Sequence, residues 1–405
     1  MLVPANVPPH FRNLLHEISR TKSSLLYTKL RWPEDALLLP FRVATYYYLP
    51  GSKQANMATT TKVQGVHFVG SVPLKDTQTV FQQCGSLLGG RIRRMPDGET
   101  GDRGQWTEFQ RQTWGDRPEL LNNMHNYRVS SAECSDEEAQ KLLESLPPAN
   151  TRFDTHALES YEVFKEAKAS GVLPKDSKFM VTFPTPLAVL AINFAAPYRR
   201  VLEGPYINGI LSALSNIEKA IPHSELAIQF DIAVEFGVLE GFIQPWFAKE
   251  DDMPGKTEGS FKRMVDLSNA VSEDVDLGYH LCYGDFGHKH FKEPEDAHYL
   301  NFVGVELIKR VKRSIEFIHL PVPIARDDEA YFTPLKELQA VRGETEIYLG
   351  LIHPRDVEGT RRRIQTASKV LQPFGVATEC GMGRTPIEDI ESILETKRDV
   401  AAPWQ

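Results

Sequence analysis

From residue 63 onward, short apolar runs rich in β-branched residues alternate with longer stretches of helical periodicity. Eight runs of the first kind predict strands: Val63–Val72, Arg91–Asp97, Lys178–Phe183, Leu226–Val234, Leu277–Cys282, Ser314–Leu320, Glu346–Ile352 and Gly375–Cys380. The stretches between them predict helices: Thr77–Leu88, Ile207–Lys219, Phe261–Ser272, Tyr299–Lys312, Leu335–Arg342 and Val357–Leu371. Strands that alternate with helices in this way are typical of a parallel α/β sheet.

Eight strand–helix units that close on themselves predict a (β/α)8 TIM barrel. About residues 102–177 interrupt the rhythm, because they are too long for a simple connection, and we expect them to form an insertion after strand 2 that hangs over the barrel mouth. The alternative is a doubly wound open sheet. That fold would want a glycine-rich phosphate turn after its first strand, and Val69–Pro73 is not one.

Residues 1–56 have a different character. They hold six prolines and seven Lys or Arg against three Asp or Glu. We expect a poorly ordered N-terminal extension, followed by one barrel domain over residues 57–405, with Met57 as a plausible start. The alternative is that residues 1–56 form a mitochondrial presequence.

Composition narrows the class of protein. The 405 residues are 41% hydrophobic and 25% charged, with a net charge of −8, which is typical of a globular protein. Without a polybasic run, we expect neither nucleic acid nor an anionic membrane as partner. Four cysteines do not make a disulfide framework, so we expect a reducing compartment, the cytoplasm. The sequence contains no run of 18 apolar residues, so it predicts no membrane-spanning helix. The expected partner is a small molecule, and an oligomer is possible.

The most informative residues lie where predicted strands end. His280 and Cys282 are spaced i, i+2 on one strand, so they share a face, and Cys380 ends the last strand. The carboxyl ends of barrel strands carry the chemistry, and thiolates with imidazole select zinc. His319, at the end of the sixth strand, is the candidate fourth ligand. The alternative is a set of buried cysteines and hydrogen-bonded core histidines.

Carboxylates occupy two further strand ends. Glu99 follows the second strand and would point into the mouth, where it could hold the ammonium of a small substrate. Gln229 and Asp231 share one face of the fourth strand as polar contacts. The alternatives are a solvated turn and a buried structural aspartate.

Two proline-stiffened loops carry cations. Arg326 lies in the loop after the sixth strand, and His353 and Arg355 follow the seventh. Arginine on a rigid loop suits a substrate carboxylate or phosphate, and we expect all three to bind substrate. Each arginine could equally form a salt bridge between loops.

Five segments, in order along residues 63–390, carry a resemblance to a known family: Val69–Pro73, Asp97–Glu99, Gln229–Ala233, His280–Tyr283 and Glu379–Arg384. They resemble the C-terminal catalytic barrel of cobalamin-independent methionine synthase, within the superfamily that also contains uroporphyrinogen decarboxylase. The resemblance implies that His280, Cys282 and Cys380 bind Zn²⁺. It also implies that the amino-acid end of a thiol substrate lies against Gly70, Ser71, Glu99 and Asp231.

The chain departs from that family in three places. The family's fourth ligand, a glutamate of the sixth strand, falls at about His319. The family's Asp-Glu-Pro-Ala motif is Asp231–Val234 here, without the glutamate. The N-terminal barrel that helps to bind the folate donor has no counterpart in this sequence.

The leading hypothesis is an enzyme of methionine-synthase type, a zinc-dependent methyltransferase that transfers a methyl or alkyl group to a small thiol, as in methionine biosynthesis. Asp231 and Glu99 would orient the reactants as catalytic residues. One alternative uses zinc as a Lewis acid in a lyase, hydrolase or cyclase acting on a carboxylate-bearing metabolite. A second alternative is an inactive barrel that serves as a binding module. A third is a metal-free decarboxylase.

Overall fold

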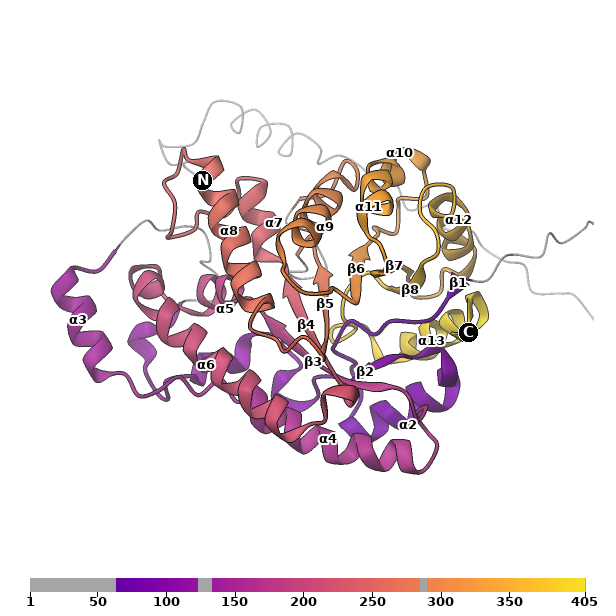
Figure 1. Ribbon diagram of the computed structural model, residues 1–405, viewed down its shortest axis with the longest axis horizontal. Coiled ribbons are helices and arrows are strands. Elements are labelled where there is room, and N and C mark those ends of the chain that lie inside the picture. Colours follow the sequence, from indigo (N-terminus) through magenta and orange to yellow (C-terminus); the bar gives the residue numbers. More distant parts are fainter. Residues whose placement is uncertain (1–62, 123–132, 285–289, 291, 405) are drawn as a thin grey trace, which may run out of the picture. The chain divides into compact units, whose positions relative to one another are not determined.

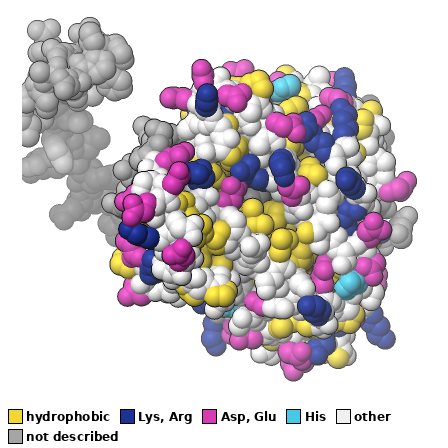
Figure 2. Space-filling model, turned by 60° about the vertical axis from the view of Figure 1, so that its left-hand side comes forward, with side chains coloured by type: hydrophobic (Ala, Val, Ile, Leu, Met, Phe, Trp, Pro, Cys, Tyr) yellow, Lys and Arg dark blue, Asp and Glu magenta, His cyan; other side chains and the backbone are white. Residues whose placement is uncertain are grey.

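The computed structural model describes residues 63–122, 133–284, 290 and 292–404. The expected N-terminal extension and its boundary at residue 57 lie outside these ranges, so that division of the chain stays a prediction. Among the described residues, no helix is long and apolar enough to cross a membrane. Basic and acidic side chains are interspersed over the face shown in Figure 2.

A parallel sheet of seven strands lies at the centre, and helices surround it (Figure 1). Its strands follow the order of the chain: β2 (Arg94–Pro96), β3 (Lys178–Pro184), β4 (Leu226–Ile232), β5 (Asp276–Leu281), β6 (Phe317–Pro321), β7 (Glu346–Ile352) and β8 (Gly375–Thr378). Nearly every residue of these strands is buried, as expected for a parallel sheet whose faces are both covered.

The predicted first strand, Val63–Val72, is the part of the barrel that differs from expectation. Only β1 (Val63–Gln64) is regular, and it pairs with β9 (Ala401–Ala402) in a separate two-stranded sheet. Gly65 adopts φ +80° and would place a Cβ inside the indole of Trp404, which breaks the extended run. Val66 then makes single parallel bridges to Ile92 and to Val376. The two edges of the curled sheet are therefore joined through one residue, in place of a regular eighth strand.

Longer helices form most of the outer layer: α2 (Thr77–Leu88), α4 (Phe153–Ala169), α6 (Arg199–Ala220), α8 (Met253–Ser268), α9 (His298–Arg310), α12 (Val357–Ala367) and α13 (Ile390–Val400). The short α11 (Lys336–Val341) packs against α9 in the same layer. Local signals set their starts. The Asp76 side chain accepts from the backbone N–H of Thr79 at 2.8 Å and caps α2, and Asp356 caps α12 in the same way.

Shorter helices lie between these elements: α3 (Asp136–Ser145), α5 (Pro186–Asn193), α7 (Val234–Leu239) and α10 (Glu329–Phe332). The chain also forms 3₁₀ turns: η1 (Gly89–Arg91), η2 (Gly101–Arg103), η3 (Glu108–Gln112), η4 (Pro118–Leu120), η5 (Ala196–Tyr198), η6 (His223–Glu225), η7 (Thr333–Leu335) and η8 (Ile387–Asp389).

The stretch expected as an insertion, residues 102–177, has two parts. Helix α4 forms the C-terminal part of this stretch. It packs against α2, α6 and β3, so it is the ordinary helical connection between β2 and β3. The additional structure lies before it. Its first turns, η2 and η3, run over the carboxyl ends of the strands, where Gly104–Glu108 line a cavity.

The amino ends of the strands are closed by ion pairs. Arg94 of β2 bonds Asp276 of β5 and Glu346 of β7, each at 2.7 Å, and Lys178 of β3 bonds Asp276 at 2.6 Å. Arg94 is only 6% exposed. Its two carboxylate partners compensate the charge that is buried there. Because these ion pairs occupy the amino ends, we expect a functional site at the opposite, carboxyl ends of the strands.

Candidate active site

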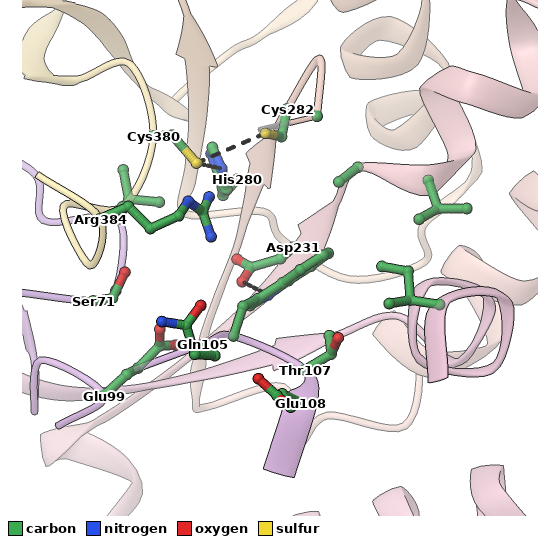
Figure 3. A pocket seen from close by; sticks show the side chains of 18 of the residues that line it. Ser71, Glu99, Gln105, Thr107, Glu108, Asp231, His280, Cys282, Cys380 and Arg384 are labelled. Carbon is green, nitrogen blue, oxygen red and sulfur yellow. Dashed lines mark hydrogen bonds between the residues drawn. The ribbon is translucent and has the colours of Figure 1, made fainter. Parts of the chain in front are cut away.

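Three potential metal ligands meet at the carboxyl ends of β5 and β8 (Figure 3). His280 lies on β5 and Cys282 follows its last residue, so the i, i+2 spacing keeps both on one face. Cys380 comes two residues after β8. The Sγ atoms of Cys282 and Cys380 are 3.8 Å apart, and Cys380 Sγ is 3.6 Å from His280 Nε2.

These distances fit zinc. Four ligands arranged tetrahedrally, with Zn–S about 2.3 Å and Zn–N about 2.05 Å, put two sulfurs about 3.8 Å apart and a sulfur and a nitrogen about 3.6 Å apart. The two distances in the structure, 3.8 and 3.6 Å, agree with these values. The sulfurs are too far apart for a disulfide, whose S–S bond is about 2.05 Å. The side chains of His280, Cys282 and Cys380 therefore suit a zinc ion held by two thiolates and one imidazole.

The structure places His319 behind this cluster rather than within it. In the parallel pairing of β5 and β6, His280 lies opposite His319, and their Nδ1 atoms are 2.7 Å apart. The other ring nitrogen of His319, Nε2, lies 3.0 Å from the carbonyl oxygen of Thr378. Both nitrogens of His319 are thus engaged, so it is not available as the expected fourth ligand.

The histidine pair fixes the tautomer of His280. A carbonyl oxygen only accepts, so Nε2 of His319 carries a proton and donates it to Thr378. Burial, with His280 nearby, holds the pKa of His319 well below its usual value, so the ring is neutral and its Nδ1 accepts from Nδ1–H of His280. This leaves the lone pair of His280 Nε2 directed at Cys380. A backbone carbonyl or other acceptor behind a ligating histidine is the usual outer partner of a metal site.

The electrostatics of the cluster favour a cation. Burial lowers the pKa of His280, but Cys380, Asp231 and Glu99 outweigh it and leave that pKa above its usual value. The Cys282 thiol and burial together raise the pKa of Cys380 well above its usual value. Two neighbouring thiols in a buried place ionise readily only when a positive ion compensates their charge.

Two carboxyl groups face the same cavity. Asp231 of β4 pairs in register with His280 of β5, and its side chain accepts from Gln229 Nε2 at 2.8 Å and from Trp106 Nε1 at 3.2 Å. Enclosure by the protein, together with Asp231, raises the pKa of Glu99 to about 7, and enclosure also raises the pKa of Asp231. Two carboxyls in this state gain from a positively charged ligand.

The loop after β2 holds Glu99 in an unusual backbone conformation. Glu99 has φ +49°, a region that non-glycine residues rarely adopt and that concentrates at functional sites. Its backbone N–H donates to Asp97 at 2.9 Å, and Asp97 is held in turn by Arg103 at 2.6 Å and Ser160 at 2.7 Å. Thr182 of β3 also donates to the Glu99 carboxylate. Asp97 and its partners thus aim Glu99 into the cavity.

Gly70 and Ser71 lie between the loop after β2 and the loop after β8. A Cβ at Gly70 would lie 3.1 Å from a Glu99 oxygen. The Oγ of Ser71 accepts from the backbone N–H of Gly383 at 3.1 Å, and its carbonyl accepts from Met382 at 2.8 Å. Ser71 therefore both lines the cavity and holds the loop that carries Cys380.

Gln229 lies beneath the cavity, fully buried. Its Nε2 donates to the Val69 carbonyl at 2.6 Å as well as to Asp231, and its Oε1 is 2.9 Å from His67 Nε2. It does not line the cavity, so the structure gives it the role of fixing Asp231 rather than touching a substrate.

The cavity encloses about 240 Å³. It brings together seven residues singled out from the sequence: Gly70, Ser71, Glu99, Asp231, His280, Cys282 and Cys380. It also contains residues that sequence reasoning did not select. Arg384 extends from the loop of Cys380 toward the carboxylates, and Gln105 faces it (Figure 3). Trp106 comes from the inserted turns, where only the Trp- and Gln-rich composition of 104–114 gave a signal.

Arg326, Arg355 and His353, which were expected to bind substrate, do not line this cavity. Arg326 bonds Asp328 at 2.8 Å and the Glu295 carbonyl at 2.6 Å, and Arg355 pairs with Asp389 at 2.6 Å. Arg355 thus forms a salt bridge between two segments, the alternative raised from the sequence, whereas the ion pair of Arg326 lies within its own loop.

His353 lines a different cavity from the one that holds the two carboxyls. With His290 and Glu379 it lines a second cavity of about 230 Å³, which also touches Cys282 and Cys380. Its Nε2 is 3.0 Å from the Val322 carbonyl oxygen, and burial lowers its pKa to about 4. His353 is therefore neutral near pH 7.

No protein-family model matches the chain, and neither does any curated protein. Similar solved structures include a B12-independent methionine synthase from Shewanella sp. W3-18-1 in complex with selenomethionine, with 15% identity and a TM-score of 0.41 over 60% of this chain. They also include a methyltransferase from Methanosarcina mazei, with 12% identity and a TM-score of 0.48 over 84% of this chain. The chain spans 65% of the methionine synthase chain and 94% of the methyltransferase chain.

Proposed function

We propose that the protein is a zinc-dependent enzyme that transfers a methyl or other alkyl group to a small thiol. The observation that carries the proposal is the donor set: two cysteine sulfurs and one imidazole nitrogen at 3.8 and 3.6 Å, the separations that tetrahedral zinc requires. The cluster opens onto a cavity that also holds two carboxyls. Three protein ligands leave a fourth position for a substrate atom.

Zinc held by His280, Cys282 and Cys380 would lower the pKa of a bound thiol, so that the sulfur is a thiolate at neutral pH. The chain's own residues do the rest. Glu99 and Asp231 would hold an ammonium group of the thiol substrate by charge-assisted hydrogen bonds. Gln229 and Trp106 keep Asp231 in place, and this positioning of one reactant is worth a large part of a transfer barrier.

The alternative of zinc acting as a Lewis acid would be favoured by two histidines among the ligands. The structure supplies one, His280, because His319 is engaged with His280 and Thr378. Sulfur-rich ligation suits the activation of a thiol, as proposed.

Metal analysis combined with a product assay tests the proposal. We expect about one zinc per chain in the purified protein, lost in Cys282→Ser and Cys380→Ser but kept in Cys134→Ser, whose cysteine lies outside the cluster. Incubation of the zinc-loaded protein with small aminothiols and methyl donors should give a thioether. Wild-type protein without zinc would overturn the proposal. Zinc with hydrolysis or elimination products, and no thioether, would favour the Lewis-acid alternative.

A further inference from the structure

One side of the cavity is lined by apolar side chains, and the mechanism above uses only Trp106 among them, through its hydrogen bond to Asp231. We call this side the apolar compartment: Trp106, Ala191, Ile192, Ala233, Val234 and Ile243. In Figure 3, Ser71, Glu99, Gln105 and Arg384 lie together at one side of the cavity, and sticks without polar atoms lie at the opposite side. Thr107 and Glu108 lie apart from both groups. The compartment belongs to a small buried cluster of its own, separate from the main core, formed by α5 and α7.

Packing and a backbone hydrogen bond hold the residues of this compartment in place. Ala191 and Val234 are buried in the cluster, while Trp106, Ile192 and Ile243 pack against it and stay partly exposed. The loop after α7 folds back, since the N–H of Ile243 donates to the Gly237 carbonyl at 3.0 Å. A Cβ on Gly237 would lie 2.6 Å from Ile243, so glycine there lets Ile243 sit against α7 beside the cavity.

Trp106 connects the apolar compartment to the charged end of the cavity. Its Nε1–H donates to Asp231 at 3.2 Å, while its ring packs against the cluster of α5 and α7. Its backbone has φ +52°, so two residues of this one cavity, Glu99 and Trp106, adopt a conformation that the surrounding structure must enforce. A single ligand can therefore touch the carboxyls and the apolar wall at once.

We propose that the substrate held at Glu99 and Asp231 carries, besides its ammonium group, an aliphatic group of several carbons that fills the apolar compartment. The inference rests on the proposed function for the placement of that substrate beside the metal ligands, and it names the substrate class. The two carboxyls select a cationic end, and the wall of alkyl side chains and indole selects an uncharged, apolar end. Pockets of this kind obtain affinity from the apolar part and orientation from the few polar groups.

Binding of straight-chain primary amines, from propylamine to hexylamine, tests the inference by calorimetry on the full chain at pH 8. Each methylene that enters the compartment should tighten binding about two- to fourfold, the upper value corresponding to about 0.8 kcal/mol per buried CH₂. Ile243→Ser, which makes the wall polar, and Ala191→Phe, which fills the space, should both flatten this dependence. The affinity for propylamine is the reference for each protein, so that only the dependence on chain length is compared.

Ile324→Ser is the matched control, because Ile324 is 56% exposed and does not line the cavity; it should keep the full dependence on chain length. Equal affinities for propylamine and hexylamine in the wild type would overturn the inference. So would an unchanged dependence in Ile243→Ser, which remains informative if Ala191→Phe fails to fold. The assay needs neither zinc nor a methyl donor. A flat series with stoichiometric zinc overturns only this inference, while a normal series without zinc overturns only the proposed function.

Discussion

The His319→Phe variant distinguishes two roles for His319: binding the metal directly, or orienting the metal ligand His280. The change removes the 2.7 Å contact with His280 and the 3.0 Å contact with Thr378, but keeps a planar ring in a fully buried position. His280 then loses the acceptor that fixes its tautomer. Loss of such an outer partner weakens metal affinity about 10- to 100-fold, which is about 1.4–2.7 kcal/mol.

The zinc dissociation constant, measured by competition with a chromophoric chelator, gives the result directly. His319→Phe should still bind one zinc per chain, with the weakened affinity above, whereas His280→Phe should lose tight binding. His67→Phe is the matched control. His67 is also a buried histidine, stacked on His319 with ring centroids 5.7 Å apart, but its Nε2 faces Gln229, so zinc affinity should not change. The reasoning fails if His319→Phe loses zinc as completely as His280→Phe does, or if its affinity equals that of the wild type.

Two other predictions concern ionisation. Because the pKa of Glu99 is raised to about 7, its anionic form, which binds a cation, appears as pH rises through 7; butylamine affinity should increase about tenfold from pH 6 to pH 8, and a calorimetric series in Glu99→Gln should show no such increase. Burial lowers the pKa of Lys397 to about 7, below the unfolded value, so the unfolded chain binds the extra proton and stability rises with pH above 7. Relative to Lys397→Met, the free energy of unfolding of the wild type, measured by urea denaturation, should increase by about 2 kcal/mol between pH 7 and pH 9. A difference in this free energy between the two proteins that does not change with pH would contradict the prediction.

The strands were predictable because their apolar runs are bounded by turns, and α2 was predictable to the residue because Asp76 caps a periodic apolar face. The first strand was not. Its residues are rich in valine, but Gly65 takes a positive φ against Trp404, a residue more than 300 positions away. Long-range packing of this kind leaves no local signal.

Within the candidate site, spacing on one strand was informative and register between strands was not. The pair His280 and Cys282 follows from the period of a strand. The contact of His319 with His280 follows from the pairing of β5 with β6, which no single strand encodes. Arg355 pairs with Asp389 of η8, which only the fold brings near, whereas Arg326 pairs with Asp328, two residues along its own loop.

The apolar compartment was missed for a related reason. Helix α5 reads PLAVLAIN and is buried nearly all round, and α7 has six residues, all buried. Neither shows the one-sided apolar pattern by which a surface helix is recognised. The two helices that contribute to the compartment therefore lack the pattern by which a helix is predicted from the sequence.

X-ray absorption at the zinc edge, recorded with and without a small aminothiol such as homocysteine, tests the central claim most directly. The account predicts two sulfur neighbours at about 2.3 Å and one imidazole nitrogen at about 2.0 Å in the protein alone. It predicts a third sulfur at the same distance once the thiol is added. A sulfur count that stays at two in the presence of saturating thiol, or zinc without sulfur neighbours, would contradict it.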